Sequence, residues 1–218
     1  MSRSLRIVHV FGSAQAGGWA TCLLDGLRQR GHRVSAVCPS DGDLPGRLAR
    51  AGIESKVMDF PTRLRRLGEG FRYVRELGRF FRSERVEVVH NHLYPTNIWG
   101  RLAAKWSRVP VRLTQWPGPL PLEYPKSCAI EMALAWMDSG IIASCRETQR
   151  IYERHGRMRN RMHLIYYGFP VEKFDPAIRG EAVRESFGLS AGHVVVSLIA
   201  YLYSPMDEGQ TPGLDPFG

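Results

Sequence analysis

The sequence lacks the features that mark disulfide-bonded, metal-binding and membrane-spanning proteins. It has only four cysteines, and no two of them stand at CxxC or another metal-type spacing (Cys22, Cys38, Cys128 and Cys145). We therefore expect reduced thiols in a cytosolic protein. No apolar run approaches the roughly 18 residues of a membrane span, and the apolar run near the N-terminus is too short for a signal peptide.

Acidic residues are scarce relative to basic ones. The 30 lysines and arginines outnumber 21 aspartates and glutamates, which gives a formal net charge of +9. Such an excess favours an anionic partner, namely a nucleotide, a phospholipid surface or a nucleic acid. No aromatic stacking platform or nucleic-acid-reading motif accompanies the charge, so we expect no nucleic-acid partner.

Short β-branched runs alternate with helical segments along most of the chain. Near-continuous apolar strands joined by crossover helices are typical of strands buried on both faces. The pattern predicts an α/β fold with a doubly wound, parallel, Rossmann-like sheet, whose ligands bind beyond the carboxyl ends of the strands. We expect strands at 6–11, 33–39, 54–60, 86–92, 109–115, 139–145 and 162–168, and helices at 18–31, 44–52, 67–85, 96–108, 124–137 and 146–156.

The alternation changes near residue 170, which predicts a domain boundary. We assign residues 1–176 to one Rossmann-like domain. Residues 177–218 read as a linker followed by the first strand, 194–200, of an incomplete second domain. The remainder is rich in glycine and proline and has no helical or strand period.

The first loop of the chain joins a predicted strand to a predicted helix. Its glycines, Gly12, Gly17 and Gly18, fit neither G-x-G-x-x-G nor a P-loop. Paired glycines at a helix N-terminus let the backbone approach a ligand, and the helix dipole favours an anion there. From the local sequence, a phosphate-binding loop and a plain tight turn remain equally open.

Two histidines close the predicted strand 86–92, where the fold puts ligands. Residues two apart on a strand share a face, although we expect His92 to lie already in the loop. A histidine here could act as a general base or bind a sugar hydroxyl or phosphate, and a purely structural role is the alternative. A metal site needs a third ligand, which the sequence does not indicate, so we expect no metal. Asn97 would open the next helix.

The proline-rich segment "TQWPGPLPLEYP", residues 114–125, follows the next predicted strand. A rigid loop at the carboxyl end of a strand can form the wall of a pocket. Trp116 could then stack on a sugar face, and Glu123 could accept hydrogen bonds from hydroxyls. The alternative is a stiff surface connection without a ligand.

The segment 63–85 is rich in arginine and has one apolar face at helical spacing. We expect that face to pack on the sheet, while the arginines leave room for docking on anionic lipid. The apolar residues are Leu64, Leu67, Phe71, Val74, Leu77 and Phe81, and the basic ones are Arg63, Arg66, Arg72, Arg75, Arg79 and Arg82.

Four segments, in order, resemble the motifs of family 4 retaining glycosyltransferases. "GGWATCLLDGLRQRGHRVSAVCP" is similar to their first loop, helix and second strand, and "VEVVHNHLYPTNIWGRLAAK" to their "DVVHxH" strand and next helix. "RMHLIYYGFPVEKFDP" resembles the segment that ends the first domain, and "RESFGLSAGHVVVSLIAYL" the opening of the second. Each match alone is weak, but together they span nearly all of the chain.

This resemblance implies a GT-B fold, with an acceptor-binding first domain and a donor-binding second domain. It implies metal-independent transfer of a sugar from a UDP- or GDP-linked donor, with retention, to a cell-envelope glycan or lipid-linked acceptor. Gly17 and Gly18 would reach the donor diphosphate, and His92 would lie near the transferred sugar as the catalytic residue. The sequence departs from the pattern at Tyr167, where asparagine is common, and in "TQWPG", where the family has a "T.H" loop.

The donor-binding motifs of this family would lie beyond Gly218. We therefore expect a truncated, inactive fragment of a glycosyltransferase, located in the cytoplasm or peripherally at the inner face of a membrane. The alternative is a non-catalytic sugar- or phosphate-binding remnant. A sugar-nucleotide 2-epimerase is a third hypothesis, which the histidines and the paired glycines fit less well.

Overall fold

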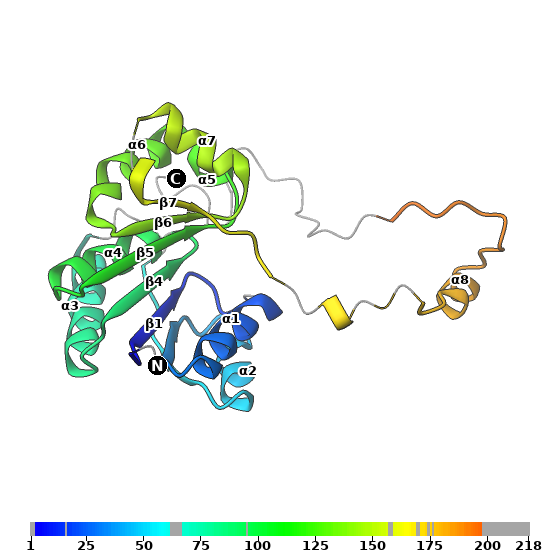
Figure 1. Ribbon diagram of the computed structural model, residues 1–218, viewed down its shortest axis with the longest axis horizontal. Coiled ribbons are helices and arrows are strands. Elements are labelled where there is room, and N and C mark those ends of the chain that lie inside the picture. Colours follow the sequence, from blue (N-terminus) through cyan, green and yellow to red (C-terminus); the bar gives the residue numbers. More distant parts are fainter. Residues whose placement is uncertain are drawn as a thin grey trace.

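The computed structural model shows one parallel β-sheet flanked by helices (Figure 1). It describes residues 3–15, 17–61, 67–94, 96–156, 159–168, 171–173, 175 and 177–197. The seven strands found there are β1 (Arg6–Phe11), β2 (Arg33–Cys38), β3 (Glu54–Val57), β4 (Val88–His92), β5 (Val111–Trp116), β6 (Gly140–Ala143) and β7 (Met162–Leu164). This confirms the predicted α/β, doubly wound fold class.

Helices fill most of the connections between these strands. They are α1 (Gly18–Gln29), α2 (Leu44–Arg50), α3 (Leu67–Ser83), α4 (Thr96–Trp106), α5 (Leu120–Glu123), α6 (Pro125–Leu134), α7 (Arg146–Arg154) and α8 (Glu181–Ser186). The described residues also include three short 3₁₀ turns, at Ala135–Met137, Arg159–Arg161 and Val171–Lys173. Every strand and helix expected between residues 6 and 164 is present, with ends that shift by a few residues.

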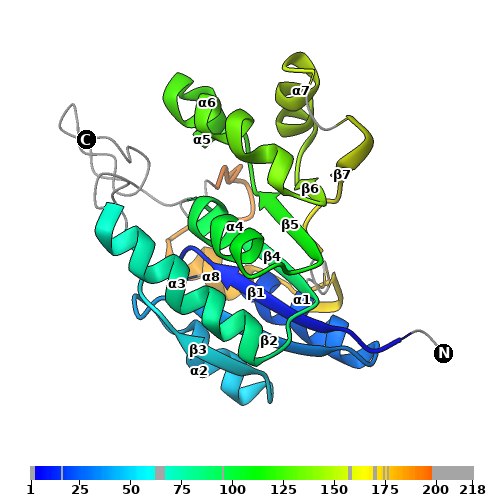
Figure 2. The same ribbon diagram turned by 90° about the vertical axis from the view of Figure 1, so that its left-hand side faces the viewer.

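The order of the strands places a topological switch point between β1 and β4. The order is β3-β2-β1-β4-β5-β6-β7, and every neighbouring pair is parallel. Phe11 and Ala36 pack with Leu24 of α1 on one face, whereas Val10 and Val89 pack with residues of α3 and α4 on the other. Figure 2 shows α3 and α4 in front of the sheet. In folds of this kind the switch point is where ligands bind.

Helices α3 and α4 approach each other closely because α3 carries glycines where they meet. A side chain at Gly70 would overlap the Trp99 ring, and one at Gly78 would overlap the Trp106 ring. The Trp99 indole also donates a hydrogen bond of 3.2 Å to the carbonyl oxygen of Pro61. Small residues at this crossing therefore make room for two large aromatic side chains.

The buried face of α3 differs from the predicted one. Gly70, Tyr73 and Leu77 belong to the buried set, but Leu67 and Phe71 are 61% and 72% exposed. The periodicity alone assigned both to the packing face. That assignment was wrong for them because the close crossing with α4 turns the glycine-bearing side of the helix inward. Residues 63–66 of the predicted arginine-rich segment lie outside the described residues.

The segment after β7 leaves the sheet. Helix α8 has no buried residue and stands apart from the sheet in Figure 1. Residues 194–197 of the predicted strand 194–200 form no strand, and residues 198–218 lie outside the described part of the chain. The division at residue 176 therefore stays a prediction.

Candidate functional site

Three histidines meet at the switch point. His9 lies on β1, and His90 and His92 lie on β4. In the pairing of β1 with β4, His9 is level with His90 and Phe11 is level with His92. All four side chains therefore share one face of the sheet. His92 is the last residue of β4, so the expectation that it already lies in the loop was wrong.

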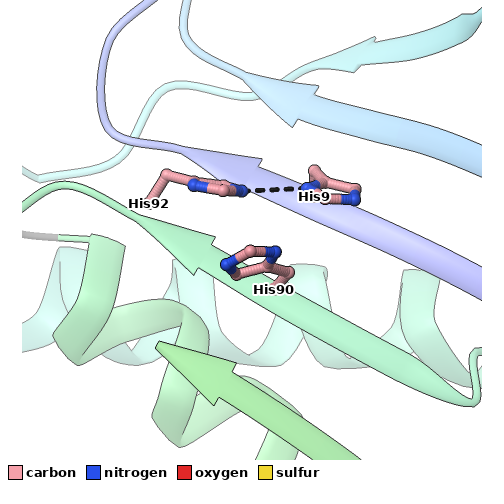
Figure 3. A group of neighbouring side chains, drawn as sticks. All are labelled: His9, His90 and His92. Carbon is pink, nitrogen blue, oxygen red and sulfur yellow. Dashed lines mark hydrogen bonds between the residues drawn. The ribbon is translucent and has the colours of Figure 1, made fainter. Parts of the chain in front are cut away.

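His9 and His92 form a hydrogen-bonded pair of imidazoles. His9 Nδ1 and His92 Nε2 are 2.9 Å apart, and the two rings are nearly coplanar, with an interplanar angle of 13° (Figure 3). The Phe11 ring stacks on His92 at a centroid distance of 4.7 Å. His9 is fully buried and His92 is 1% exposed. In this arrangement His92 points into the protein.

Burial keeps all three imidazoles neutral. Desolvation lowers the pKa of His90 to about 3 and lowers the pKa values of His9 and His92 well below the usual range for histidine. Proximity adds to this, since a charge on His90 would repel one on His9 or His92. At neutral pH each ring therefore carries one N–H and one lone pair.

A metal site would need a third ligand besides His90 and His92, and the structure brings His9 next to them. One ring nitrogen from each of the three histidines lies within 4.8 Å of the others, a separation from which small side-chain shifts could bring them onto one metal ion. Zinc held by imidazoles requires each lone pair to point at the ion, at about 2.0–2.1 Å. The near-coplanar His9–His92 pair instead joins a lone pair to an N–H, so a metal would first have to break that hydrogen bond.

A pocket of about 450 Å³ opens beside the histidines on the α1 face of the sheet. Its walls are mostly apolar and aromatic, with few polar groups. The lining residues are Trp19, Cys22, Leu23, His90, Gln115, Ile142, Ile165, Tyr166, Tyr167 and Gly168. The pocket therefore lies at the switch point, as the fold rule requires, and His90 rather than His92 is part of its wall.

Polar side chains lie close together at this wall of the pocket. The Gln115 amide donates to Ser144 Oγ over 3.0 Å. Gln115 slightly offsets the lowering of the pKa values of both His90 and His92, and Ser144 slightly offsets the raised pKa of Tyr167. Desolvation raises the pKa of Tyr167. Tyr167, which replaces the asparagine usual in family 4, thus belongs to the pocket.

The first loop is held in place by the loop after β2 and by the end of β4. The Asp41 carboxylate accepts the Ala14 N–H over 2.7 Å, and the Gly12 N–H donates to the His92 carbonyl over 2.9 Å. Gly17 and Gly18 are exposed at the start of α1, and a methyl group on Gly18 would meet nothing within 4 Å. Packing within this chain therefore gives no reason for a glycine at position 18. The exposed backbone there could instead be approached by a ligand.

The other predicted contact residues do not join this pocket. Trp116 is 1% exposed and packs with Leu122 and Ile141, so its indole is not available for stacking on a sugar. Asn97 is fully buried and donates to the Gln115 carbonyl over 3.2 Å. Glu123 is exposed at the end of α5, a short helix in the predicted loop.

Sequence reasoning missed His9, Gln115 and the aromatic residues after β7. A usable signal was present for the first two. His9 precedes the last residue of its strand by two positions, and β1 neighbours β4 in doubly wound sheets. Gln115 is level with His92 in the next strand. The contribution of Tyr167 depends on the path of the chain after β7, which no local pattern specifies.

A second cleft, of about 620 Å³, lies at the opposite edge of the sheet. Its lining includes Arg6, Arg28, His32, Arg33 and Arg85, from the amino ends of strands and the ends of α1 and α3. Although larger, it lies away from the carboxyl ends of the strands and from the histidines. We therefore assign the candidate site to the smaller pocket.

Solved structures with this fold include glycosyltransferases. HepE from Anabaena, in complex with UDP and glucose, superposes with a TM-score of 0.68 at 19% identity, covering 84% of this chain and 50% of that one. A glycosyltransferase from Rickettsia africae gives a TM-score of 0.67 at 16% identity, covering 88% of this chain and 51% of that one.

The same fold also occurs in a UDP-N-acetylglucosamine 2-epimerase, with a TM-score of 0.53 at 12% identity, covering 75% of this chain and 46% of that one. The chain thus spans about half the length of the structures it matches. No curated protein sequence matches it significantly.

A family model matches most of the chain directly. The match covers residues 8–168, from β1 to the end of the pocket wall at Gly168. It includes the three histidines, the paired glycines and Tyr167. The fold, the position of the site and this match agree, and the chain belongs to the glycosyl transferase 4-like domain family.

Proposed function

We propose that this chain supplies the acceptor-side half of a sugar-transferring enzyme that uses a nucleotide-sugar donor. The observation that carries the proposal is the pocket at the switch point, with the exposed glycines of α1 nearby. The pocket offers aromatic side chains, which pack well against sugar rings, and few polar groups to fix orientation. The residues that hold most of the nucleotide would lie outside these 218 residues.

In this proposal, an acceptor hydroxyl in the pocket attacks the anomeric carbon of the donor sugar with retention. The bond from that carbon to the diphosphate breaks, the glycosidic bond forms, and the hydroxyl proton passes to the departing diphosphate. The free N–H groups at Gly17 and Gly18 would stabilise the charge that develops there. No step requires a metal. Because the His92 ring faces inward in this structure, a catalytic role for it stays a prediction.

Calorimetric titration tests whether this chain binds the acceptor but not the nucleotide-sugar donor. Phenyl β-D-glucopyranoside, an acceptor-like probe, should bind, whereas UDP-glucose and GDP-mannose should bind with a Kd of about 1 mM or weaker. Micromolar binding of either nucleotide sugar would contradict the proposal, since the chain would then hold the donor by itself. Absence of glycoside binding would remove the acceptor role.

We further propose that α3 contacts anionic lipid at the cytoplasmic face of a membrane, where a lipid-linked acceptor would be presented. No helix in the described residues is long and apolar enough to cross a membrane. The exposed Leu67 and Phe71 lie on the same helix as the exposed Arg72 and Arg75. Apolar side chains beside arginines are typical of interfacial helices.

Co-sedimentation with vesicles tests this membrane contact. The chain should bind vesicles that contain phosphatidylglycerol and leave pure phosphatidylcholine vesicles unbound. Replacing both Arg72 and Arg75 by glutamine should weaken binding by about 2 kcal/mol, roughly 30-fold. Equal binding of the variant and the original chain would show that this face of α3 is not the contact.

A further inference from the structure

The pocket at the switch point has a mainly apolar wall, and part of that wall is open to solvent. Leu23 of α1 and Ile142 of β6 line it together with Ile165 and Tyr166, which follow β7. Ile165 is 53% exposed and Tyr166 is 59% exposed, so a molecule in solution can reach them. Exposed apolar side chains that line a concave site are typical of a binding surface.

The polar side chains of the wall offer little to a ligand inside the pocket. His90 is 7% exposed, and its Nε2 atom is buried. Gln115 is 5% exposed, and its amide group is already hydrogen-bonded within the protein. A sugar ring enclosed there would lose water from several hydroxyls and find few replacement partners, which is unfavourable. A hydrocarbon group has no such hydrogen bonds to lose, and its burial is favourable.

Trp19 connects this apolar pocket to the paired glycines at the start of α1. Its side chain lines the pocket, and a methyl group on Gly17 would lie only 3.3 Å from its Cδ1 atom. The Trp19 ring also contacts the Tyr167 ring, with centroids 4.6 Å apart. One aromatic side chain therefore borders both the pocket and the loop that we propose to face the donor diphosphate.

We propose that the pocket binds the hydrocarbon aglycone of the acceptor, while the acceptor sugar lies beside Trp19 at the edge of the apolar wall. The aglycone is then buried against Leu23, Ile142 and Ile165, and the sugar hydroxyls stay in contact with water. The sugar also lies next to the ring that contacts Gly17. This inference rests on the proposed function of the pocket and specifies its substrate class, namely glycosides with an apolar aglycone.

Calorimetric titration with two glucosides that differ only in the aglycone tests this inference. Hexyl β-D-glucopyranoside should bind at least about tenfold more tightly than methyl β-D-glucopyranoside, because each methylene group that leaves water can contribute about fourfold. Ile165→Gln should weaken binding of the hexyl glucoside about threefold to fivefold and leave binding of the methyl glucoside unchanged. Val57→Gln is the matched control, since Val57 is 51% exposed on β3 and lies outside the pocket, and it should bind both normally.

Alkylation of Cys22 shows whether the hydrocarbon enters this pocket. The Cys22 thiol is exposed and lines the pocket, so iodoacetamide should label it in the free chain. The hexyl glucoside should slow this labelling at least about threefold, as expected when most of the pocket is occupied. The methyl glucoside at the same concentration should have little effect. Mass spectrometry of the peptide that contains Cys22 measures the rate, and this experiment needs no variant.

The outcomes separate this inference from the proposed function. Equal binding of the two glucosides would overturn the inference and leave the acceptor role of the pocket intact. Tighter binding of the hexyl glucoside would also overturn it if Cys22 labelling stays unchanged, or if Ile165→Gln and Val57→Gln weaken binding equally, because the hydrocarbon would then lie elsewhere. If neither glucoside binds, the proposed function and the inference both fall. Thermal melting of each variant shows whether a loss of binding reflects a loss of fold.

Discussion

Replacing Arg101 by leucine should destabilise the protein by about 3–5 kcal/mol, because it leaves two buried carboxylates without their cation. The Arg101 guanidinium makes two hydrogen bonds of 2.9 and 2.8 Å to Glu131 and an ion pair of 2.7 Å with Asp138. The side chains of Arg101 and Asp138 are fully buried, and that of Glu131 is 2% exposed. The Tyr152 hydroxyl also donates to Glu131.

Urea unfolding of Arg101→Leu at pH 8 measures this effect. The matched control is Arg150→Leu, which removes an exposed ion pair with Glu147 and should cost less than about 1 kcal/mol. Burial already raises the pKa of Asp138 to about 7 even with Arg101 present, so the variant should recover part of its stability as the pH falls and Asp138 becomes protonated. Equal losses for the two variants would contradict a buried ionic cluster.

Lowering the pH from 7.5 to 5.5 should destabilise the chain through its three buried histidines. The pKa of His90 falls from 6.5 in the unfolded chain to about 3 in the folded protein, so the unfolded state binds more protons between these values. Its contribution to stability is complete above pH 6.5 and is lost at about 1.4 kcal/mol per pH unit below it. His9 and His92 act in the same direction.

Asp138 opposes this trend but does not cancel it. Its raised pKa means that the folded state binds a proton that the unfolded state releases, so Asp138 alone favours stability as the pH falls from 7 towards 4. The gain in stability from this one aspartate is smaller than the combined loss from the three histidines. Denaturant unfolding across the pH range measures the sum, and His90→Gln should have a shallower slope below pH 6.5. A chain that grows more stable on acidification would show that the histidines are not buried and neutral.

The sheet could be predicted from the sequence because strands buried on both faces are recognisable as short, near-continuous apolar runs. Apolar runs such as 6–11 and 86–92 are short and β-branched, and the helices between them have clear ends. The face of α3 could not be predicted in the same way. Which side of that helix turns inward depends on where Gly70 meets Trp99, and this contact joins segments that are distant in the sequence.

The sequence predicted that the candidate site lies at the carboxyl ends of the strands, but it predicted only some of the residues that line the pocket. The rule that ligands bind beyond the carboxyl ends of strands led to His90 and His92, and the order of the motifs led to the family. Trp116 looked suitable for stacking because it follows a strand, yet strand residues alternate between faces, and the ring packs on the side away from Gln115 with the core. A residue's chemistry predicts a contact only when its face of the sheet is known.

Nuclear magnetic resonance of the ¹⁵N-labelled chain, titrated with phenyl β-D-glucopyranoside, tests most directly whether this domain holds a sugar acceptor at its switch point. We expect the largest chemical-shift changes at the Trp19 indole and at the backbone amides of Gln115, Tyr167 and Gly168, which line the pocket. Changes confined to the cleft around Arg28 and His32 at the opposite edge, or no changes at all, would contradict the assignment.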